Sequence, residues 1–86
     1  MRKALISNKR GLHARAAAKL AKTAADFNAD IHVSKCGQTV SGLSIMGLMM
    51  LAAAQGSEIT LTATGPDQEP ALDALCTLID NRFGEE

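Results

Sequence analysis

The sequence lacks tryptophan and tyrosine, and its only aromatic residues are Phe27 and Phe83. Proteins that bind RNA or single-stranded nucleic acid commonly stack the bases on aromatic side chains. Both phenylalanines fall in apolar patterns that are typical of a buried core. The sequence therefore disfavours an RNA-binding domain, and we expect no nucleic-acid partner.

Long hydrophobic runs are also missing. The longest one, residues 48–54, is far shorter than the roughly 20 apolar residues that a helix needs to cross a bilayer. The first residues are basic, but no apolar stretch of adequate length separates them from Lys9 and Arg10, so no secretion signal is predicted. We expect a cytoplasmic protein without a membrane partner.

Cysteine is scarce and widely spaced. Cys36 and Cys76 lack the close spacing of a metal site or a redox motif, so we expect two reduced, structural thiols and no metal ion. The glycine pattern of a phosphate-binding loop is absent as well. We therefore predict that this chain binds no nucleotide and carries no cofactor.

The chain has 86 residues, of which 47% are apolar, and these values are typical of one globular domain over residues 1–86. A domain of this size has little room for a deep substrate cleft. Its chemistry should therefore lie at the surface and use a few residues.

Charge is unevenly distributed along the chain, although the formal net charge is zero. Residues 1–22 contain seven basic residues and no carboxylate, whereas residues 58–86 contain seven carboxylates and a single basic residue, Arg82. A basic segment of this kind favours an anionic ligand or an acidic partner surface.

The periodicity of apolar residues predicts the order strand, helix, strand, strand, helix, strand, helix. These elements span about residues 3–7, 14–27, 30–34, 38–41, 44–51, 58–64 and 67–83. Cys36 and Gly37 predict the tight turn of a hairpin, and Asp67 predicts the N-cap of the last helix. This order is typical of an α+β domain with one four-stranded, mostly antiparallel sheet and its helices on one face.

Residues 8–20 hold the candidate functional site. Gly11 follows the first predicted strand, and His13 lies where the first helix begins. A helix N-terminus presents free N–H groups and a positive dipole end, so it is a ready anion site. Arg15 adds a planar guanidinium suited to phosphate oxygens. A lone histidine at such a position is more commonly a cap or a surface residue, and spacing alone does not show that it is phosphorylated.

These groups together match the needs of phosphoryl transfer, which depends mainly on positioning and charge neutralisation. A neutral imidazole of His13 keeps one ring nitrogen as a nucleophile. The backbone N–H groups of Ala14, Arg15 and Ala16 would then hold the phosphoryl oxygens. Because no nucleotide site is predicted, the phosphoryl donor must be another phosphorylated protein.

Four segments of this sequence, taken together, resemble the motifs of a known protein family. Residues 11–15 read Gly-Leu-His-Ala-Arg and residues 44–47 read Ser-Ile-Met-Gly, and residues 54–59 and 62–65 follow in the same order as in a known family. In a chain of this length they resemble the HPr family, the histidine-containing phosphocarriers of the bacterial phosphotransferase system. The resemblance covers nearly the whole chain and implies an open-faced β-sandwich with three helices.

The resemblance implies a carrier rather than an enzyme. Enzyme I, itself charged from phosphoenolpyruvate, would phosphorylate Nδ1 of His13, Arg15 would steady the phosphate, and a IIA-type protein would receive it. The carrier is expected to be a monomer. Sugar uptake and nitrogen-related regulation both use such carriers, and the residues that decide between them lie on the partners.

At Ala16 the sequence departs from the family, which usually has proline after the arginine. Proline would fix φ in the first turn of the helix and remove an N–H group. Alanine loosens that constraint but restores an amide that can bind phosphate. The departure concerns the start of the helix and not the role of His13.

The resemblance also implies that partners dock on the first helix and on the short helix after Ser44. The candidate docking residues are apolar, namely Leu12, Ala16, Ile45, Met46 and Met49. Ordinary core packing is the alternative interpretation for the methionines, including Met50.

Ser44 is suited to cap the N-terminus of the short helix and needs no other function for that. In many relatives of the family the matching serine is phosphorylated by a dedicated kinase. A phosphate there would place charge beside Ile45 and Met46 and hinder docking. His32 falls on the polar face of a predicted strand, so we expect a solvated histidine there rather than a second site.

A non-catalytic regulatory module is the alternative function. Such a module would bind a small anion or a transcription factor through the same helix ends. The presence of His13 together with Arg15 argues against it, because some relatives that act only by binding lack the histidine.

Overall fold

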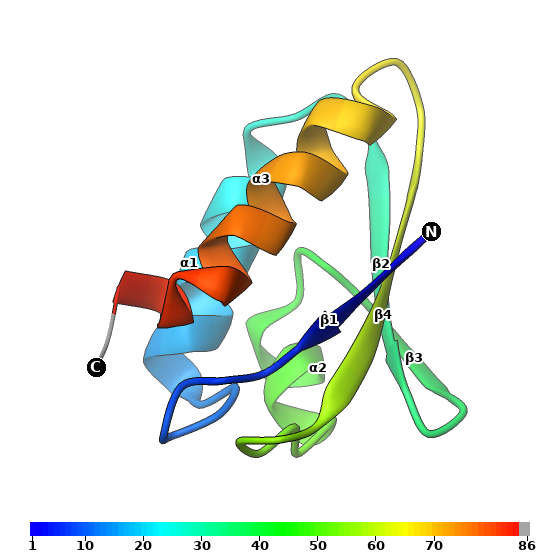
Figure 1. Ribbon diagram of the computed structural model, residues 1–86. Coiled ribbons are helices and arrows are strands. Elements are labelled where there is room, and N and C mark those ends of the chain that lie inside the picture. Colours follow the sequence, from blue (N-terminus) through cyan, green and yellow to red (C-terminus); the bar gives the residue numbers. More distant parts are fainter. Residues whose placement is uncertain (85–86) are drawn as a thin grey trace.

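The computed structural model describes residues 1–84 and consists of an antiparallel sheet with three α-helices on one face (Figure 1). The strands are β1 (Arg2–Leu5), β2 (Asp30–Lys35), β3 (Gln38–Ser41) and β4 (Glu58–Thr64), and they lie in the order β1-β4-β2-β3. The helices are α1 (Ala14–Ala25), α2 (Ile45–Met50) and α3 (Gln68–Asp80), followed by a short 3-10 helix, η1 (Arg82–Gly84). The predicted fold class and order of elements are confirmed.

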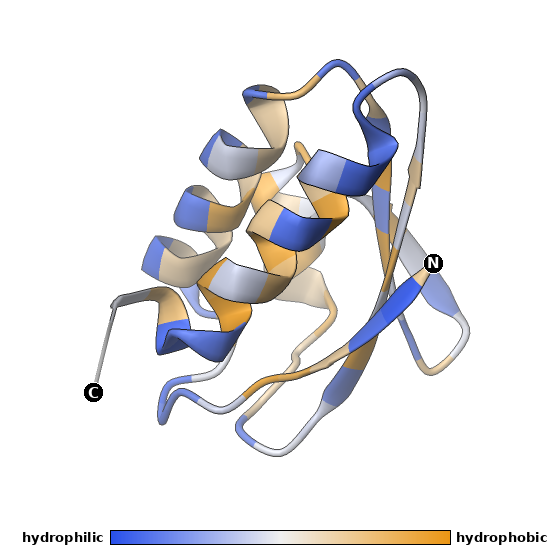
Figure 2. Ribbon diagram, turned by 45° about the horizontal axis from the view of Figure 1, so that its top comes forward, coloured by the Kyte–Doolittle hydropathy of each residue, from blue (hydrophilic) through white to orange (hydrophobic). Residues whose placement is uncertain are grey.

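The core lies between the sheet and the helices. Apolar residues alternate with threonines along β4, so Ile59 and Leu61 are buried under the helices while Thr60 and Thr62 belong to the opposite face. Figure 2 shows the apolar sides of α1 and α3 turned toward the sheet and their polar sides turned outward. In residues 1–84, no helix is long and apolar enough to cross a membrane.

Two helices end earlier than their apolar periodicity predicts. α1 ends at Ala25, so Phe27 packs half-buried beside the core instead of on the helix. α3 ends at Asp80, and Phe83 reaches the core from η1, where it is completely buried. The Nζ atom of Lys19 donates a hydrogen bond to the Phe83 carbonyl oxygen at 2.6 Å. This bond connects α1 to η1.

Asp67 is the N-cap residue of α3, as predicted, but without a side-chain capping bond. Its Oδ2 atom instead accepts the backbone N–H of Asn28 at 2.8 Å. The reason is its backbone conformation, φ −103° and ψ 23°, which is not the extended conformation from which a cap residue reaches back to the first turn. Asp67 therefore joins the loop after α1 to the start of α3.

The hairpin between β2 and β3 turns at Cys36 and Gly37, as predicted. Lys35 pairs with Gln38, so the loop has two residues, and both have positive φ, 50° at Cys36 and 82° at Gly37. This is the geometry of a type I′ turn, whose first position usually holds asparagine or another residue that tolerates a left-handed backbone. Cys36 and Cys76 are both free thiols, and Cys36 is exposed rather than structural.

We expect Cys36→Asn to stabilise the domain by about 1 kcal/mol, because asparagine adopts the left-handed conformation at lower cost. Urea unfolding of the two proteins measures this difference in free energy. Cys36→Ser is the control, since it removes the thiol without favouring positive φ and should change stability by less than about 0.5 kcal/mol. Equal stability of the two variants would contradict the strain at Cys36.

Candidate functional site

His13 is the N-cap residue of α1. Its backbone is extended, with φ −80° and ψ −177°, and its Nδ1 atom accepts the backbone N–H of Arg15 at 3.3 Å. The first intrahelical hydrogen bond runs from the Ala17 N–H to the His13 carbonyl at 2.8 Å, so the N–H groups of residues 14–16 precede the helical ladder. The Nδ1 atom must carry a lone pair to accept this bond. The ring thus directs an unprotonated nitrogen at the positive end of the helix.

The half-buried His13 side chain lines a shallow depression of about 220 Å³. Its other lining residues are Arg10, Leu12, Ala52, Ala53 and Ala54. Within residues 1–84, no carboxylate lines the depression. An anion bound there would therefore meet a guanidinium and the N-terminus of α1, and no carboxylate from the described lining.

The turn before His13 is held by Asn8, a residue that the sequence analysis did not single out. Asn8 is completely buried, and its Nδ2 atom donates to the Gly11 carbonyl oxygen at 2.7 Å. The Gly11 N–H in turn donates to the Asn8 carbonyl oxygen at 3.1 Å. Asparagine three residues before glycine is a turn signal that could have indicated this role.

Gly11 is required at this turn because its Cα approaches another segment closely. Its φ is 65°, and a Cβ atom would lie 2.4 Å from the Ala53 carbonyl oxygen and 2.8 Å from the Ala54 Cα atom. The next residue, Leu12, donates its N–H to the same Ala53 carbonyl at 2.8 Å. Residues 52–54 therefore form one wall of the site, which the sequence pattern did not predict.

Lys35 supports this wall from β2. Its Nζ atom lies 3.3 Å from the Leu51 carbonyl oxygen and 3.4 Å from the Ala52 carbonyl oxygen, at the C-terminal end of α2. Ala52 has a positive φ of 53°, so the chain turns sharply there before it reaches Ala53. A lysine at this position satisfies helix-end carbonyls and complements the negative end of the helix dipole.

Arg15, Ala14 and Ala16 all lie in the first turn of α1. Arg15 is exposed, and its guanidinium has no ion pair with any carboxylate of residues 1–84. α1 begins at Ala14 without a proline in this turn, so the alanine at position 16 does not displace the helix start. The Ala16 methyl group is buried, whereas its N–H group belongs to the N-terminal end of the helix.

The predicted docking residues fall into two groups. Leu12 and Ala16 are buried, 4% and 0% exposed, so the prediction that they form an exposed docking patch is wrong. Both side chains turn inward because the segment that enters α1 packs against the core. Ile45, Met46 and Met49 are exposed, and Leu43 and Met50, not among the predicted docking residues, extend the same surface. We call the five exposed residues the α2 patch: Leu43, Ile45, Met46, Met49 and Met50.

Ser44 is the N-cap of α2. Its Oγ atom accepts the Gly47 N–H at 3.0 Å, and its carbonyl accepts the Leu48 N–H at 2.9 Å. The predicted capping role is confirmed. Because Ile45 and Met46 follow directly, any group added to Ser44 would lie beside the α2 patch.

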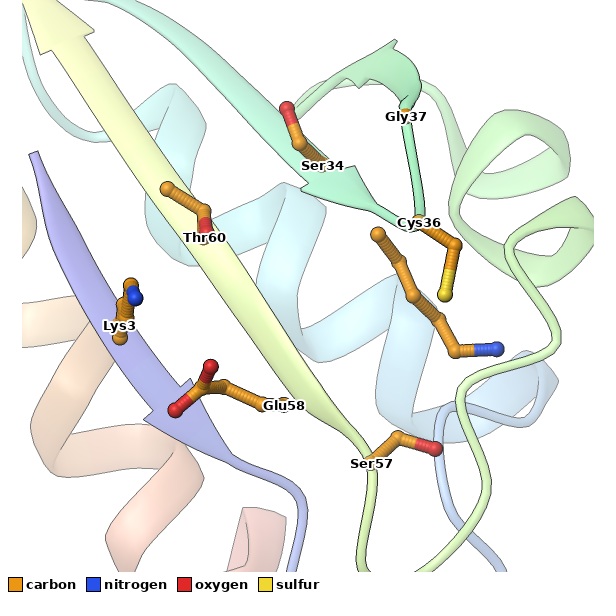
Figure 3. Close-up of a pocket in the computed structure, with 8 residues that line it drawn as sticks. Lys3, Ser34, Cys36, Gly37, Ser57, Glu58 and Thr60 are labelled. Carbon is orange, nitrogen blue, oxygen red and sulfur yellow. The ribbon is translucent and has the colours of Figure 1, made fainter.

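A second depression, about 550 Å³, lies elsewhere, on the outer face of the sheet (Figure 3). It is open, and the figure shows Lys3, Glu58 and Thr60 on neighbouring strands of this face. None of the predicted site residues lines it.

His32, the second histidine of the chain, lies on β2. Its Nδ1 atom is 4.0 Å from an Asp30 carboxylate oxygen. The described residues contain no cluster of three or more acidic, histidine or cysteine side chains that could hold a metal ion.

A family model described as the PTS HPr component phosphorylation site matches residues 1–81. The chain belongs to the HPr family. The phosphocarrier protein HPr of Cupriavidus necator is 55% identical over 93% of this chain and 90% of its own length. The phosphocarrier protein NPr of Shewanella violacea is 46% identical over 98% of this chain and 92% of its own. The solved structure HPr-C-His from Thermoanaerobacter tengcongensis superposes with a TM-score of 0.93 at 45% identity, covering 100% and 99% of the two chains.

These relatives confirm the open-faced sandwich and the phosphocarrier function of the HPr family in the phosphotransferase system. They are named as carriers, which agrees with the prediction of a carrier protein rather than a catalytic enzyme. In this HPr-family chain the matched region contains the N-cap histidine, the depression and the α2 patch.

In this HPr-family chain we expect Gly11→Ala to reduce the free energy of unfolding by about 2–4 kcal/mol, from backbone strain and from overlap with the Ala53 carbonyl. Gly56→Ala is the matched control. Its φ is also positive, 92°, but a Cβ atom there meets nothing within 4 Å, so it should cost about 1–2 kcal/mol. Denaturant unfolding measures both changes. Equal losses would show that the close approach at Gly11 is unimportant.

Proposed function

We propose that His13 is the residue of this carrier that accepts the phosphoryl group, through its Nδ1 atom, and passes it to a partner. Phosphorylated enzyme I is the donor and a IIA-type protein the acceptor, in a sugar or nitrogen-related phosphotransferase system. The observation that carries the proposal is the hydrogen bond from the Arg15 N–H to Nδ1, which points an unprotonated ring nitrogen at the N-terminus of α1.

The transfer needs no proton to leave Nδ1, because that atom already accepts a hydrogen bond. Its lone pair forms the new bond to phosphorus, and the bond between phosphorus and the donor atom breaks, returning its electron pair to the donor. The phosphoryl oxygens then replace Nδ1 as the acceptor for the Arg15 N–H group and also accept from the N–H groups of Ala14 and Ala16. Transfer to the next protein reverses these steps.

The Arg15 guanidinium neutralises part of the phosphoryl charge in this proposal. Its exposure and its lack of an ion pair within residues 1–84 leave it able to follow the phosphoryl group as that group moves between proteins. Guanidinium groups bind the oxygens of phosphate in a bidentate fashion, which positions as well as neutralises. The N–H groups fixed by the helix and the exposed Arg15 guanidinium therefore make complementary contacts to the phosphoryl group.

The test is incubation with enzyme I and labelled phosphoenolpyruvate. The natural chain should gain an acid-labile, alkali-stable label, and His13→Ala should gain none. His32→Ala is the matched control and should be labelled fully, because this second histidine lies on the sheet. Label retained in His13→Ala would sink the assignment, and a natural chain that binds partners without accepting label would favour the regulatory module.

Arg15→Ala extends the same experiment. It should still be labelled, but its transfer rate should fall by about tenfold or more, because one donor to the transferred group is lost. An unchanged rate would remove Arg15 from the mechanism.

We propose that partners dock on the α2 patch, close to the site. α2 leads directly into residues 52–54, which line the His13 depression, so a protein seated on the patch also reaches the histidine. The five exposed apolar side chains all lie within residues 43–50, on or beside α2, and are suited to a transient interface. Basic residues near His13, Lys9 and Arg10, would attract an acidic partner.

We also propose that the chain works as a cytoplasmic monomer, because every group of the site comes from one copy. A related structure from Thermoanaerobacter tengcongensis, 44% identical, is described as an HPr dimer. The α2 patch and the His13 depression are both open in a single chain, as docking of successive partners requires.

Ser44 is proposed as a regulatory site for a serine kinase. A phosphate there would keep an acceptor at the N-terminus of α2 while placing negative charge beside Ile45 and Met46. The phosphate would therefore weaken docking and leave the domain folded.

We expect Ser44→Asp to slow phosphoryl transfer from enzyme I, mainly through a higher KM, while unfolding stability changes little. Ser44→Ala should instead lose about 1 kcal/mol of stability and transfer normally. Ser34→Asp, which adds the same charge on the outer face of the sheet, is the control and should transfer like the natural chain. Equal kinetics of the two aspartate variants would contradict an effect on docking.

A further inference from the structure

Arg10 lies in the same depression as His13, although it is not part of the motif at residues 11–15. The two hydrogen bonds between Asn8 and Gly11 close the turn that contains Arg10. The positive φ of Gly11 then redirects the chain, so that residues on both sides of this glycine line one depression. Arg10 and His13 are thereby brought to the same small surface.

Two other basic side chains of residues 1–22, and that of Lys35 on β2, have partners among the described residues. Arg2 forms ion pairs with Glu69 and Asp73, Lys19 donates to the Phe83 carbonyl, and Lys35 donates at the end of α2. Arg10 is exposed and has no ion pair with any carboxylate of residues 1–84. A guanidinium with no counter-charge among residues 1–84, in a depression whose described lining holds no carboxylate, favours a bound anion.

We propose that Arg10 contacts the phosphoryl group on His13, as a second guanidinium opposite the helix N-terminus. This inference rests on the proposed function of His13. A phosphoryl group brings up to two negative charges, and Arg15 with the helix dipole supplies about one and a half positive charges. The positive charge of Arg10 is enough to neutralise what remains. It forms and breaks hydrogen bonds only, while the phosphorus–nitrogen bond forms at His13.

Lys9 provides a matched control. It is the residue before Arg10 and is also exposed, but it does not line the depression. Lys9→Gln and Arg10→Gln remove the same charge from neighbouring positions. Long-range attraction of an acidic partner should therefore weaken to a similar extent in both variants, and only Arg10→Gln should lose a contact to the phosphoryl group.

The experiment measures the equilibrium of label between enzyme I and the carrier, for the natural chain and both variants. Arg10→Gln should still be labelled on His13, but its phosphorylated fraction should correspond to an equilibrium constant about two- to fivefold lower. Lys9→Gln should keep the natural equilibrium. In a ¹⁵N-labelled natural chain, phosphorylation should also shift the Nε–H signal of Arg10, assigned by its loss in Arg10→Gln.

Equal equilibria for the two variants, or an Arg10 Nε–H signal that phosphorylation does not move, would overturn the role of Arg10. Failure of the proposed function is a separate outcome, since it would appear as absent label on the natural chain or as label on His13→Ala. The side chains of Lys9 and Arg10 are exposed, so both variants should fold, and unfolding curves verify this.

Discussion

The hydrogen bond from the Leu12 N–H to the Ala53 carbonyl holds together the two segments on which the site depends. One segment enters α1 and carries His13, and the other leaves α2. Gly11 allows them to meet, because its Cα lies where any Cβ atom would overlap the same carbonyl. The depression is formed between these segments, and the α2 patch lies next to it. In the function that we propose, phosphoryl chemistry and partner recognition therefore share one region of a small domain.

The proposed site would let a domain without a deep cleft hold a doubly charged group. The N–H groups of the first turn of α1 are already oriented, since the helix fixes them and the packing of Ala16 and Ala17 fixes the helix. Such preorganised donors need no rearrangement when charge arrives. An open surface is also an advantage for a carrier, because donor and acceptor proteins must reach the same atom in turn.

The basic half of the sequence divides into two kinds of cation in the folded chain. Arg2 and Lys19 stabilise the fold, through α3 carboxylates and the Phe83 carbonyl. Arg10 and Arg15 have no such partner within residues 1–84 and lie on either side of His13 in the sequence. Part of the charge that composition assigns to residues 1–22 is thus used in structural contacts, and part lies beside His13.

The sequence by itself determined the order of elements, because alternation along β4 and helical spacing along α1 and α3 are local patterns with a period. It also determined that His13 and Ser44 begin helices, since caps depend on neighbouring residues. Only the tertiary structure decided which side chains face inward. Leu12 and Ala16 are buried, Asp67 bonds to Asn28, and residues 52–54 complete the site. These facts depend on packing between segments about 40 residues apart, which no local pattern contains.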